Sequence, residues 1–271
     1  MLEAIQARRS VRTYDGRPLS AEHRDRITKH LANAENPFGV PVTLRLLDAK
    51  AYGLSSPVIV GEKQYLAGKV RRVENYELAF GYTFETACLY AKTLGLGTVM
   101  LAASLNRSAF EAAMQVGADE VLPCASPIGY PAEKMSLRET VMRKGVKADR
   151  RLPFETLFFR GDFEHPLQPS EAGVFAEALA MLRLAPSAVN RQPWRCVVTD
   201  DRVDFYERHS MAENRLGDIQ KVDLGIALSH FDLTRQAQGI EGAFVKRPPA
   251  APADGKLEYV LSFVAKPKDK E

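Results

Sequence analysis

This chain of 271 residues contains the same order of expected secondary-structure elements twice. The repeat limits the folds that the chain can adopt. In the first pass, a helix expected at residues 20–34 precedes an apolar strand and a long helix at 76–94. In the second pass, a helix expected at 170–184, begun by a serine cap, precedes an apolar strand and a long helix at 222–238. The matched segments share little identity, so coincidence is the alternative. The shared order favours an internal duplication.

The remaining expected elements complete an α+β pattern. The helix at 76–94 is apolar nearly all round, so we expect it to be buried at the centre of the fold. We therefore expect mixed or antiparallel sheets packed around long central helices, with halves at residues 1–160 and 161–271 intertwined as one compact pseudo-dimer. A polar, basic stretch at 132–160 links the halves. Strands are expected at 42–47, 57–60, 99–101, 121–128, 196–199, 203–206 and 257–265, and a shorter helix at 108–116.

The composition excludes several classes of protein. Lys and Arg number 37 against 34 acidic residues, and this excess is too small and dispersed to indicate a nucleic-acid partner. The three cysteines are far apart and form no CxxC pair, so we expect neither a disulfide scaffold nor a zinc site. The start lacks the apolar core of a signal peptide, and no run approaches 18 apolar residues, so we expect a cytoplasmic protein without a membrane partner.

The segment Arg8-Arg9-Ser10-Val11-Arg12 is a candidate anion site. If it is extended, alternation puts Arg8, Ser10 and Arg12 on one side. Two guanidinium groups that flank a hydroxyl suit a phosphate, because arginine donates hydrogen bonds in a fork that matches phosphate oxygens. The alternative is a solvated basic stretch near the terminus.

The string APSAVNRQPW at residues 185–194 is the other candidate. Its two prolines stiffen the loop, while Ser, Asn and Gln supply both donors and acceptors. A rigid polar loop between a helix and a strand suits recognition of a flat heterocycle with a polar edge. A plain helix terminator is the alternative, and Trp194 is better explained as core packing.

Other motifs are weak. Gly95 and Gly97 lack the third glycine and the preceding strand of a dinucleotide fingerprint, and no P-loop or GxSxG string occurs. The five histidines form no HExxH or HxxxH pattern, and His230 inside the second long helix is expected to be a satisfied core residue.

Together, RRSVRTYDGRPLS, PSAVNRQPWRCVV and GYP resemble the nitroreductase family of flavoproteins, most closely the branch with two halves fused in one chain. In ordinary members the two longer motifs lie in one subunit, and two subunits share each flavin; here the motifs lie in different halves. The resemblance implies an FMN-dependent oxidoreductase that passes electrons from NADH or NADPH to a small acceptor, nitroaromatic or quinone-like. The protein supplies binding and electrostatics in such enzymes, so no side chain is assigned a catalytic role.

The resemblance also implies how FMN is held. Arg8 and Ser10 would bind the phosphate, and Arg12 would lie at the N1–C2=O edge of the flavin. A backbone N–H after the central helix, for which we choose Ala102, would face N5. Either Arg150 or Arg151, with Arg150 slightly favoured, would be the second phosphate ligand. The full implied set is Arg8, Arg9, Ser10, Arg12, Met100, Leu101, Ala102, Ala103, Arg150, Arg151, Pro186, Ser187, Ala188, Asn190 and Gln192, with Gln192 the least certain.

Departures from the family pattern limit these expectations. The second half has no RRS-type segment and the first half has no PSxxN loop, so we expect one FMN per chain and a monomer that acts as a pseudo-dimer. Ala102 and Ala103 stand where family members often carry a glycine, and the extra methyl groups would crowd the flavin edge. A flavin-binding protein without turnover, for storage or sensing, is therefore the alternative. A third reading is a ligand-free packing of the two halves.

Overall fold

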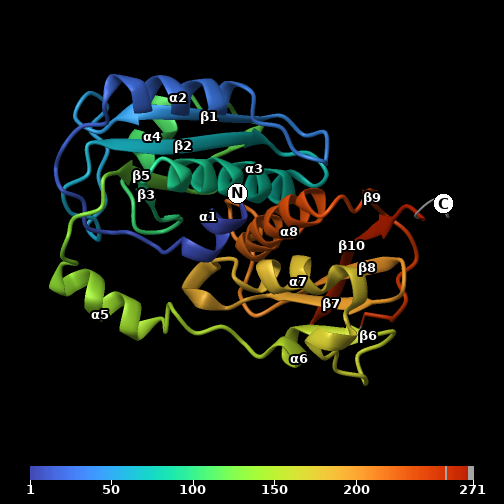
Figure 1. The fold of residues 1–271 in the computed structure, drawn as a ribbon. Helices are drawn as coiled ribbons and strands as arrows, with labels where there is room; N and C mark the ends of the chain where they lie inside the picture. The colour runs from blue at the N-terminus through green and yellow to red at the C-terminus, as the bar shows by residue number, and fades with distance from the viewer. Residues whose placement is uncertain (254, 268–271) are drawn as a thin grey trace.

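The computed structural model describes residues 1–253 and 255–267. Two sheets lie on either side of a central pair of long helices, and the N-terminus lies near this centre (Figure 1). Among the described residues, no helix is both long and apolar enough to cross a membrane.

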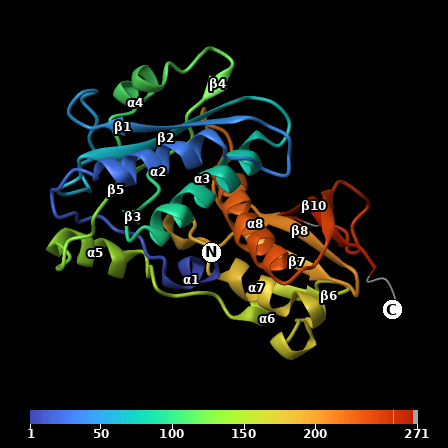
Figure 2. The same cartoon turned by 45° about the horizontal axis from the view of Figure 1, so that its top comes forward.

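The first sheet has the strand order β1-β2-β5-β3, and every pair in it is antiparallel. The helices α2 and α3 cover one face, and α4 covers the other through a separate small core around Tyr65 and Phe110 (Figure 2). The elements are α2 (Ala21–Ala32), β1 (Val42–Asp48), β2 (Gln64–Arg71), α3 (Tyr76–Thr93), β3 (Gly97–Thr98), α4 (Arg107–Met114), β4 (Glu120–Val121) and β5 (Ala125–Gly129).

The second sheet repeats this topology. Its order is β7-β8-β10-β9, again antiparallel throughout, with β6 (Phe158–Arg160) added in parallel at the β7 edge. The correspondence β1 to β7, β2 to β8, β5 to β10 and β3 to β9 holds for both order and direction. The elements are α7 (Ala176–Arg183), β7 (Trp194–Val198), β8 (Arg202–Arg208), α8 (Ile219–Ala237), β9 (Gly242–Val245) and β10 (Leu257–Ala265). The expected α+β fold with an internal duplication is confirmed.

The long helices α3 and α8 cross at two glycines (Figure 2). A Cβ atom on Gly81 would lie 2.0 Å from the carbonyl oxygen of Val222, and one on Gly225 would lie 2.2 Å from that of Leu78. The two backbones can therefore approach this closely only because neither residue has a side chain. The crossing is itself pseudo-symmetric. Gly81 meets the carbonyl of Val222, three residues before Gly225, and Gly225 meets the carbonyl of Leu78, three residues before Gly81.

Three expected elements are wrong. Residues 99–101 do not form a strand: β3 ends at Thr98, and Leu101 makes only an isolated bridge to Ala125. Residues 57–60 do not form a strand: Pro57 has no N–H, Ile59 donates its N–H back to Ser56 in a turn, and only Val60 pairs with the N-terminal segment. The strand that follows β1 along the chain is β2 instead. Ser170 does not cap a long helix, because two short 3₁₀ turns precede α7, and Gly173 has a left-handed φ of 55° between them.

Two other expectations need correction of detail. The expected strand at 121–128 is divided at Pro123, which has no N–H, into β4 and β5. The linking stretch at 132–160 holds two helices that we did not expect, α5 (Leu137–Gly145) and α6 (Phe154–Leu157). Strand β6 at the end of this stretch belongs to the second sheet, so the division of the chain at residue 160 stays a proposal.

Candidate functional site

The basic N-terminal segment, residues 8–14, is extended and is called the arm below. The short helix α1 (Leu2–Ala7) anchors its start by burying Ala4 and Ile5 against the central helices. Bridges from Ser10 to Thr98 and from Thr13 to Val60 then hold the arm beside β3. The arm therefore follows the edge of the first sheet and reaches the centre of the molecule.

Arg8 enters the core between the long helices. Its side chain is 7% exposed, and its Nε lies 3.5 Å from Glu85 Oε1. His230 Nε2 lies 2.9 Å from the same oxygen, and His230 Nδ1 lies 3.1 Å from the Met181 carbonyl. His230 is thus a satisfied core residue, as expected. Arg8 Nε has no hydrogen-bond partner among the described residues despite its burial.

Arg12 shows the same feature more strongly. Its Nε and Nη1 are buried and neither has a hydrogen-bond partner within the described chain. Burial lowers the pKa of its guanidinium, because removal from water disfavours the charged form. The buried donors of Arg12 are therefore available to an anion.

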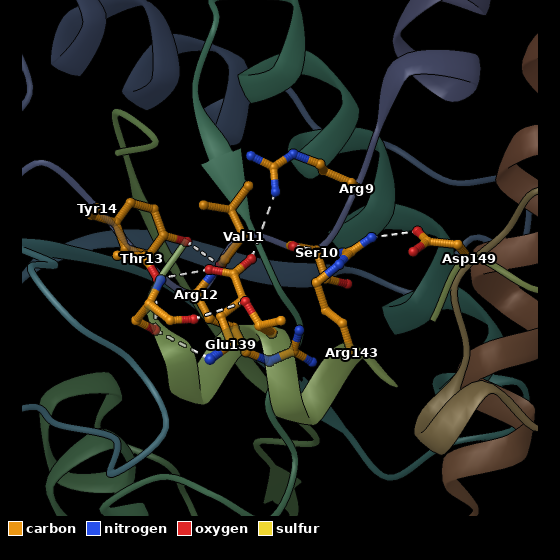
Figure 3. Close-up of polar contacts among 11 residues, drawn as sticks. Arg9, Ser10, Val11, Arg12, Thr13, Tyr14, Glu139, Arg143 and Asp149 are labelled. Carbon is orange, nitrogen blue, oxygen red and sulfur yellow. Dashed lines mark hydrogen bonds and ion pairs between the residues drawn. The ribbon is translucent and has the colours of Figure 1, made fainter. Parts of the chain in front are cut away.

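Glu139 on α5 lies against the arm (Figure 3). Its Oε2 accepts hydrogen bonds from the Arg12 backbone N–H at 3.2 Å and from the Thr13 hydroxyl at 2.8 Å. Its Oε1 lies 3.7 Å from Arg9 Nη1, and the carboxylate is 1% exposed. A buried carboxylate of the protein itself therefore uses donors of the candidate anion site.

The chain after α5 extends these ties. Arg143 donates to the Ser10 carbonyl at 3.2 Å and pairs with Asp149 (Figure 3). Arg151 donates to the Ala148 carbonyl at 2.9 Å and to the Leu184 carbonyl at 3.0 Å, yet its Nε is buried without a partner in the described residues. Burial and the nearby charge of Arg8 lower the pKa of Arg151. The Arg151 guanidinium is therefore partly buried, whereas the side chain of Arg150 is exposed.

The stretch at residues 132–160 is called the linker below. The proline-framed loop, residues 185–193, contacts the part of the linker that follows α5. Asn190 Nδ2 donates to the carbonyls of Lys147 at 2.8 Å and Arg150 at 2.9 Å. Gln192 Oε1 accepts the Leu152 N–H at 2.9 Å, and the Gln192 N–H donates to Ser187 Oγ at 2.8 Å. Trp194, directly after the loop, is 0% exposed, as expected of core packing.

A buried carboxylate of α8 fixes the start of the loop. The Ala188 N–H lies 3.0 and 2.9 Å from the two oxygens of Asp223. Asp223 is 3% exposed, and its burial raises its pKa well above the usual value. Pro186 and Ser187 beside it are half-buried.

The segment after the first long helix reaches the same region of the first sheet. Leu101 pairs with Ala125 through two backbone hydrogen bonds of 2.8 and 3.1 Å. Arg107 donates to the Ala102 carbonyl and, at 2.6 Å, to the Leu122 carbonyl. Met100 and Ala102 are half-buried and Ala103 is exposed. The hydrogen bonds of Leu101 and Arg107 hold the backbone of this segment in place.

Arm and loop line different hollows. The first, of about 130 Å³, is lined by Arg8, Arg9, Val11, Lys92, Leu96, Gly97, Thr98 and Pro131. The second, of about 540 Å³, is lined by Gly145, Val146, Lys147, Arg150, Leu152, Val189, Asn190, Arg191 and Gln192. They share no residue, and the linker contacts both arm and loop. The arm and the proline-framed loop thus both contact the linker, but they do not line the same hollow.

Sequence reasoning missed Glu139, Arg143 and Asp223. A signal for the first was present: Ser136 is followed three residues later by Glu139, which is the pattern of a helix start. In the structure Ser136 Oγ accepts the Glu139 N–H and caps α5. Asp223 had no local signal, because its partner is 35 residues earlier.

Comparisons with known proteins give a consistent result. Residues 1–235 match the family described as "Putative TM nitroreductase". A solved structure described as a putative nitroreductase from Thermotoga maritima aligns with a TM-score of 0.65 and 22% identity, over 98% of this chain and 94% of that chain. An FMN-dependent nitroreductase from Clostridium difficile aligns with a TM-score of 0.41 and 17% identity, over 53% of this chain and 96% of that chain. No curated protein matches the chain.

Proposed function

Because the chain belongs to this nitroreductase family, we propose that it is an FMN-dependent oxidoreductase that uses NADH or NADPH. Its electron acceptor would be a small molecule, nitroaromatic or quinone-like. FMN, when bound, supplies the transfer of electrons between the nicotinamide and that acceptor. The residues of the chain supply binding, charge and exclusion of water.

One observation carries the proposal. Arg8, Arg12 and Arg151 each bury at least one guanidinium nitrogen that has no hydrogen-bond partner in the described part of the chain, although Arg8 Nε lies 3.5 Å from Glu85. A buried charged donor without an acceptor costs roughly 1–3 kcal/mol or more, so three such groups favour an anionic ligand. A phosphate provides several acceptor oxygens and a negative charge that arginine matches in geometry. The donor set therefore fits the phosphate of FMN.

The proposal assigns each part of the site a role. Arg8 and Arg151, which each bury a guanidinium nitrogen, would hold the phosphate together with Ser10. Arg12 would place its positive charge at the N1–C2=O edge of the flavin, where negative charge develops on reduction. Because its donors are already buried there without a hydrogen-bond partner, this stabilisation would be preorganised. Ala102 would offer its N–H toward N5 from a backbone segment that Arg107 holds in place.

The loop residues would complete the site from the second half. Ala188 is held by Asp223, and Asn190 and Gln192 hold the linker. Since the arm and the loop line separate hollows, we propose that FMN binding moves the linker between them. The same movement would release the arm from Glu139.

The first test measures FMN affinity by quenching of flavin fluorescence. Arg8→Gln combined with Arg151→Gln removes two charge-assisted contacts of roughly 1.5–3 kcal/mol each, so affinity should fall about 100-fold or more. The matched control is Arg24→Gln combined with Arg26→Gln on the exposed face of α2, which removes the same charge. Unchanged affinity in a double variant that retains its circular dichroism spectrum would rule out the phosphate site.

A flavin-binding protein without turnover is the second candidate, favoured by Ala102 and Ala103, whose methyl groups would crowd the flavin edge. The absorbance of the FMN-loaded protein separates the two. Bleaching on addition of NADH or NADPH supports the oxidoreductase, whereas a loaded protein that stays yellow with both supports the binder.

A further inference from the structure

Three ligand-type side chains converge where β8 meets the start of α8, a region that the proposed function does not use. Glu207 lies near the end of β8, His209 follows this strand, and Asp218 caps α8. One potential ligand atom from each lies within 4.8 Å of the others. Loop residues 210–217 connect the two elements.

Glu207 is buried without the partners that a carboxylate needs. It is 0% exposed, and neither of its oxygens accepts a hydrogen bond from the described residues. Its Oε1 lies 3.0 Å from His209 Nδ1. A buried carboxylate that accepts no hydrogen bond requires either a proton or a cation.

His209 is arranged as metal-binding histidines usually are. Its Nε2 lies 2.9 Å from Glu258 Oε2, so a proton on Nε2 is donated to this carboxylate. Nδ1 then carries a lone pair, and it lies 3.0 Å from Glu207 Oε1 and 3.9 Å from Asp218 Oδ2. A carboxylate that accepts the second ring N–H is the common outer contact of a metal-bound imidazole.

Asp218 divides its two oxygens between two roles. Oδ1 accepts the Gln220 N–H at 2.8 Å and caps α8, which leaves Oδ2 toward His209. Gln220 Oε1 in turn accepts the N–H groups of Ser210 and Met211 at 2.7 Å. The surrounding hydrogen bonds therefore hold the cluster in place independently of any ligand.

Carboxyl groups outnumber the basic groups around the cluster. Glu207 and Glu258 stand directly opposite each other in the β8–β10 register, where like charges repel. Glu77 adds a fourth carboxylate, 3.4 Å from the Asp218 N–H. Lys221, 3.1 Å from Glu258, supplies one positive charge against these four carboxylates.

We propose that Glu207, His209 and Asp218 bind a divalent cation of the class that accepts an imidazole nitrogen with carboxylate oxygens, such as Zn²⁺. Zinc ligands lie about 2.0–2.2 Å from the ion, which separates tetrahedral ligand atoms by about 3.4 Å. The distances of 3.0 and 3.9 Å from Nδ1 to the two carboxylates bracket this value. Water would fill the fourth position, and the ion would fasten loop 210–217 between β8 and α8.

The spacing of the chain did not reveal this site. Glu207 and His209 are two residues apart, as for side chains on one face of a strand, but Asp218 is nine residues further on. The fold brings it back by placing the start of α8 against the end of β8. The proposal does not depend on FMN.

The test uses the full chain, freed of metal by dialysis against a chelator and then equilibrated with Zn²⁺ alone. Elemental analysis after equilibrium dialysis should give one Zn²⁺ per chain. At a hundredfold excess over the dissociation constant, the midpoint of thermal unfolding should rise by roughly 5 °C or more. His209→Ala should abolish both effects, and Glu258→Gln, which loses the outer contact, should weaken Zn²⁺ binding about 10–100-fold.

A matched control comes from another histidine that pairs with a carboxylate. His165 Nδ1 lies 2.7 Å from Asp162 Oδ1, and both side chains are exposed. The His165→Ala protein should therefore still bind one Zn²⁺ per chain and show the same rise in the midpoint of thermal unfolding. Absence of Zn²⁺ binding by the unaltered protein, or equal binding by His209→Ala, would overturn the proposal. If His209→Ala does not fold, the affinity of Glu258→Gln decides, since that side chain is 44% exposed.

Discussion

The carboxylate of Glu139 satisfies at the arm some of the donors that an anionic ligand would need. It accepts the Arg12 backbone N–H and the Thr13 hydroxyl, and it lies close to the charge of Arg9. A negative group buried among these donors lowers their attraction for a second anion, because two like charges cannot share one dry site at low cost. In the proposed function, Glu139 therefore lowers the attraction of the arm for the anionic FMN.

Glu139→Gln should bind FMN more tightly than the unaltered protein. The amide oxygen still accepts one hydrogen bond and keeps the arm ordered, while the competing charge is removed. We expect the dissociation constant to fall about tenfold, which corresponds to about 1.4 kcal/mol. Flavin fluorescence titration measures this change.

Glu133→Gln is the matched control, because Glu133 is exposed on the same linker and the substitution removes the same charge. Its affinity should equal that of the unaltered protein. A Glu139→Gln protein that binds FMN no better, or more weakly, would show that the carboxylate supports the arm rather than competes with the ligand.

Residue-level prediction succeeded where a side chain is explained by its immediate surroundings. Trp194, the only tryptophan, and His230, inside the second long helix, were expected in the core, and both are buried there. The choice between Arg150 and Arg151 could not be made in this way, because the two are adjacent and alike. Only the fold shows that Arg151 buries its Nε while Arg150 is exposed, and it is Arg151 that we now propose as the phosphate ligand.

At the scale of elements, the glycine crossing of α3 and α8 sets how closely the two halves pack. Gly81→Ala would place a methyl carbon 2.0 Å from the Val222 carbonyl oxygen, and neither backbone can yield without separating the helices. Overpacking of this kind costs about 1–3 kcal/mol and outweighs the roughly 1 kcal/mol by which alanine favours a helix. Chemical denaturation should show a lower free energy of unfolding for Gly81→Ala, and likewise for Gly225→Ala.

Gly145→Ala in α5 is the control for this effect. A Cβ there meets no atom within 4 Å, so only the helix preference acts and stability should stay equal or rise slightly. Equal stability of Gly81→Ala and the unaltered protein would mean that the helices can separate at no cost.

Elements were predictable from the sequence where a single period dominates. The long helices have no internal proline and a nearly continuous apolar surface, so their type and length followed directly, and β10 was expected at the residues it occupies. The failures occurred where short apolar runs contain a proline, as at 57–60, or where a serine cap competes with a nearby glycine, as at 170–173. Helix α5 was missed because a polar helix held by a few buried contacts carries little apolar periodicity.

At the scale of the whole molecule, the duplicated topology has kept its symmetry in the sheets and lost it in the proposed site. Both sheets share strand order and direction, and the central helices meet through equivalent glycines. The arm, however, exists only before the first sheet, and the proline-framed loop only before β7. The site can thus be assembled only once, from one motif of each half.

This asymmetry predicts the stoichiometry and the oligomeric state of the FMN-loaded protein. The α3–α8 contact inside one chain supplies the interface that a dimer would otherwise form, so sedimentation should show a monomer. Quantified flavin released from that monomer should approach one FMN per chain, because the second half lacks an arm and the first half lacks the loop. Two FMN per chain would mean that a second site exists which uses neither motif. FMN found only in a dimeric fraction would mean instead that the missing contacts come from another chain, and that the fused halves do not replace the subunit interface.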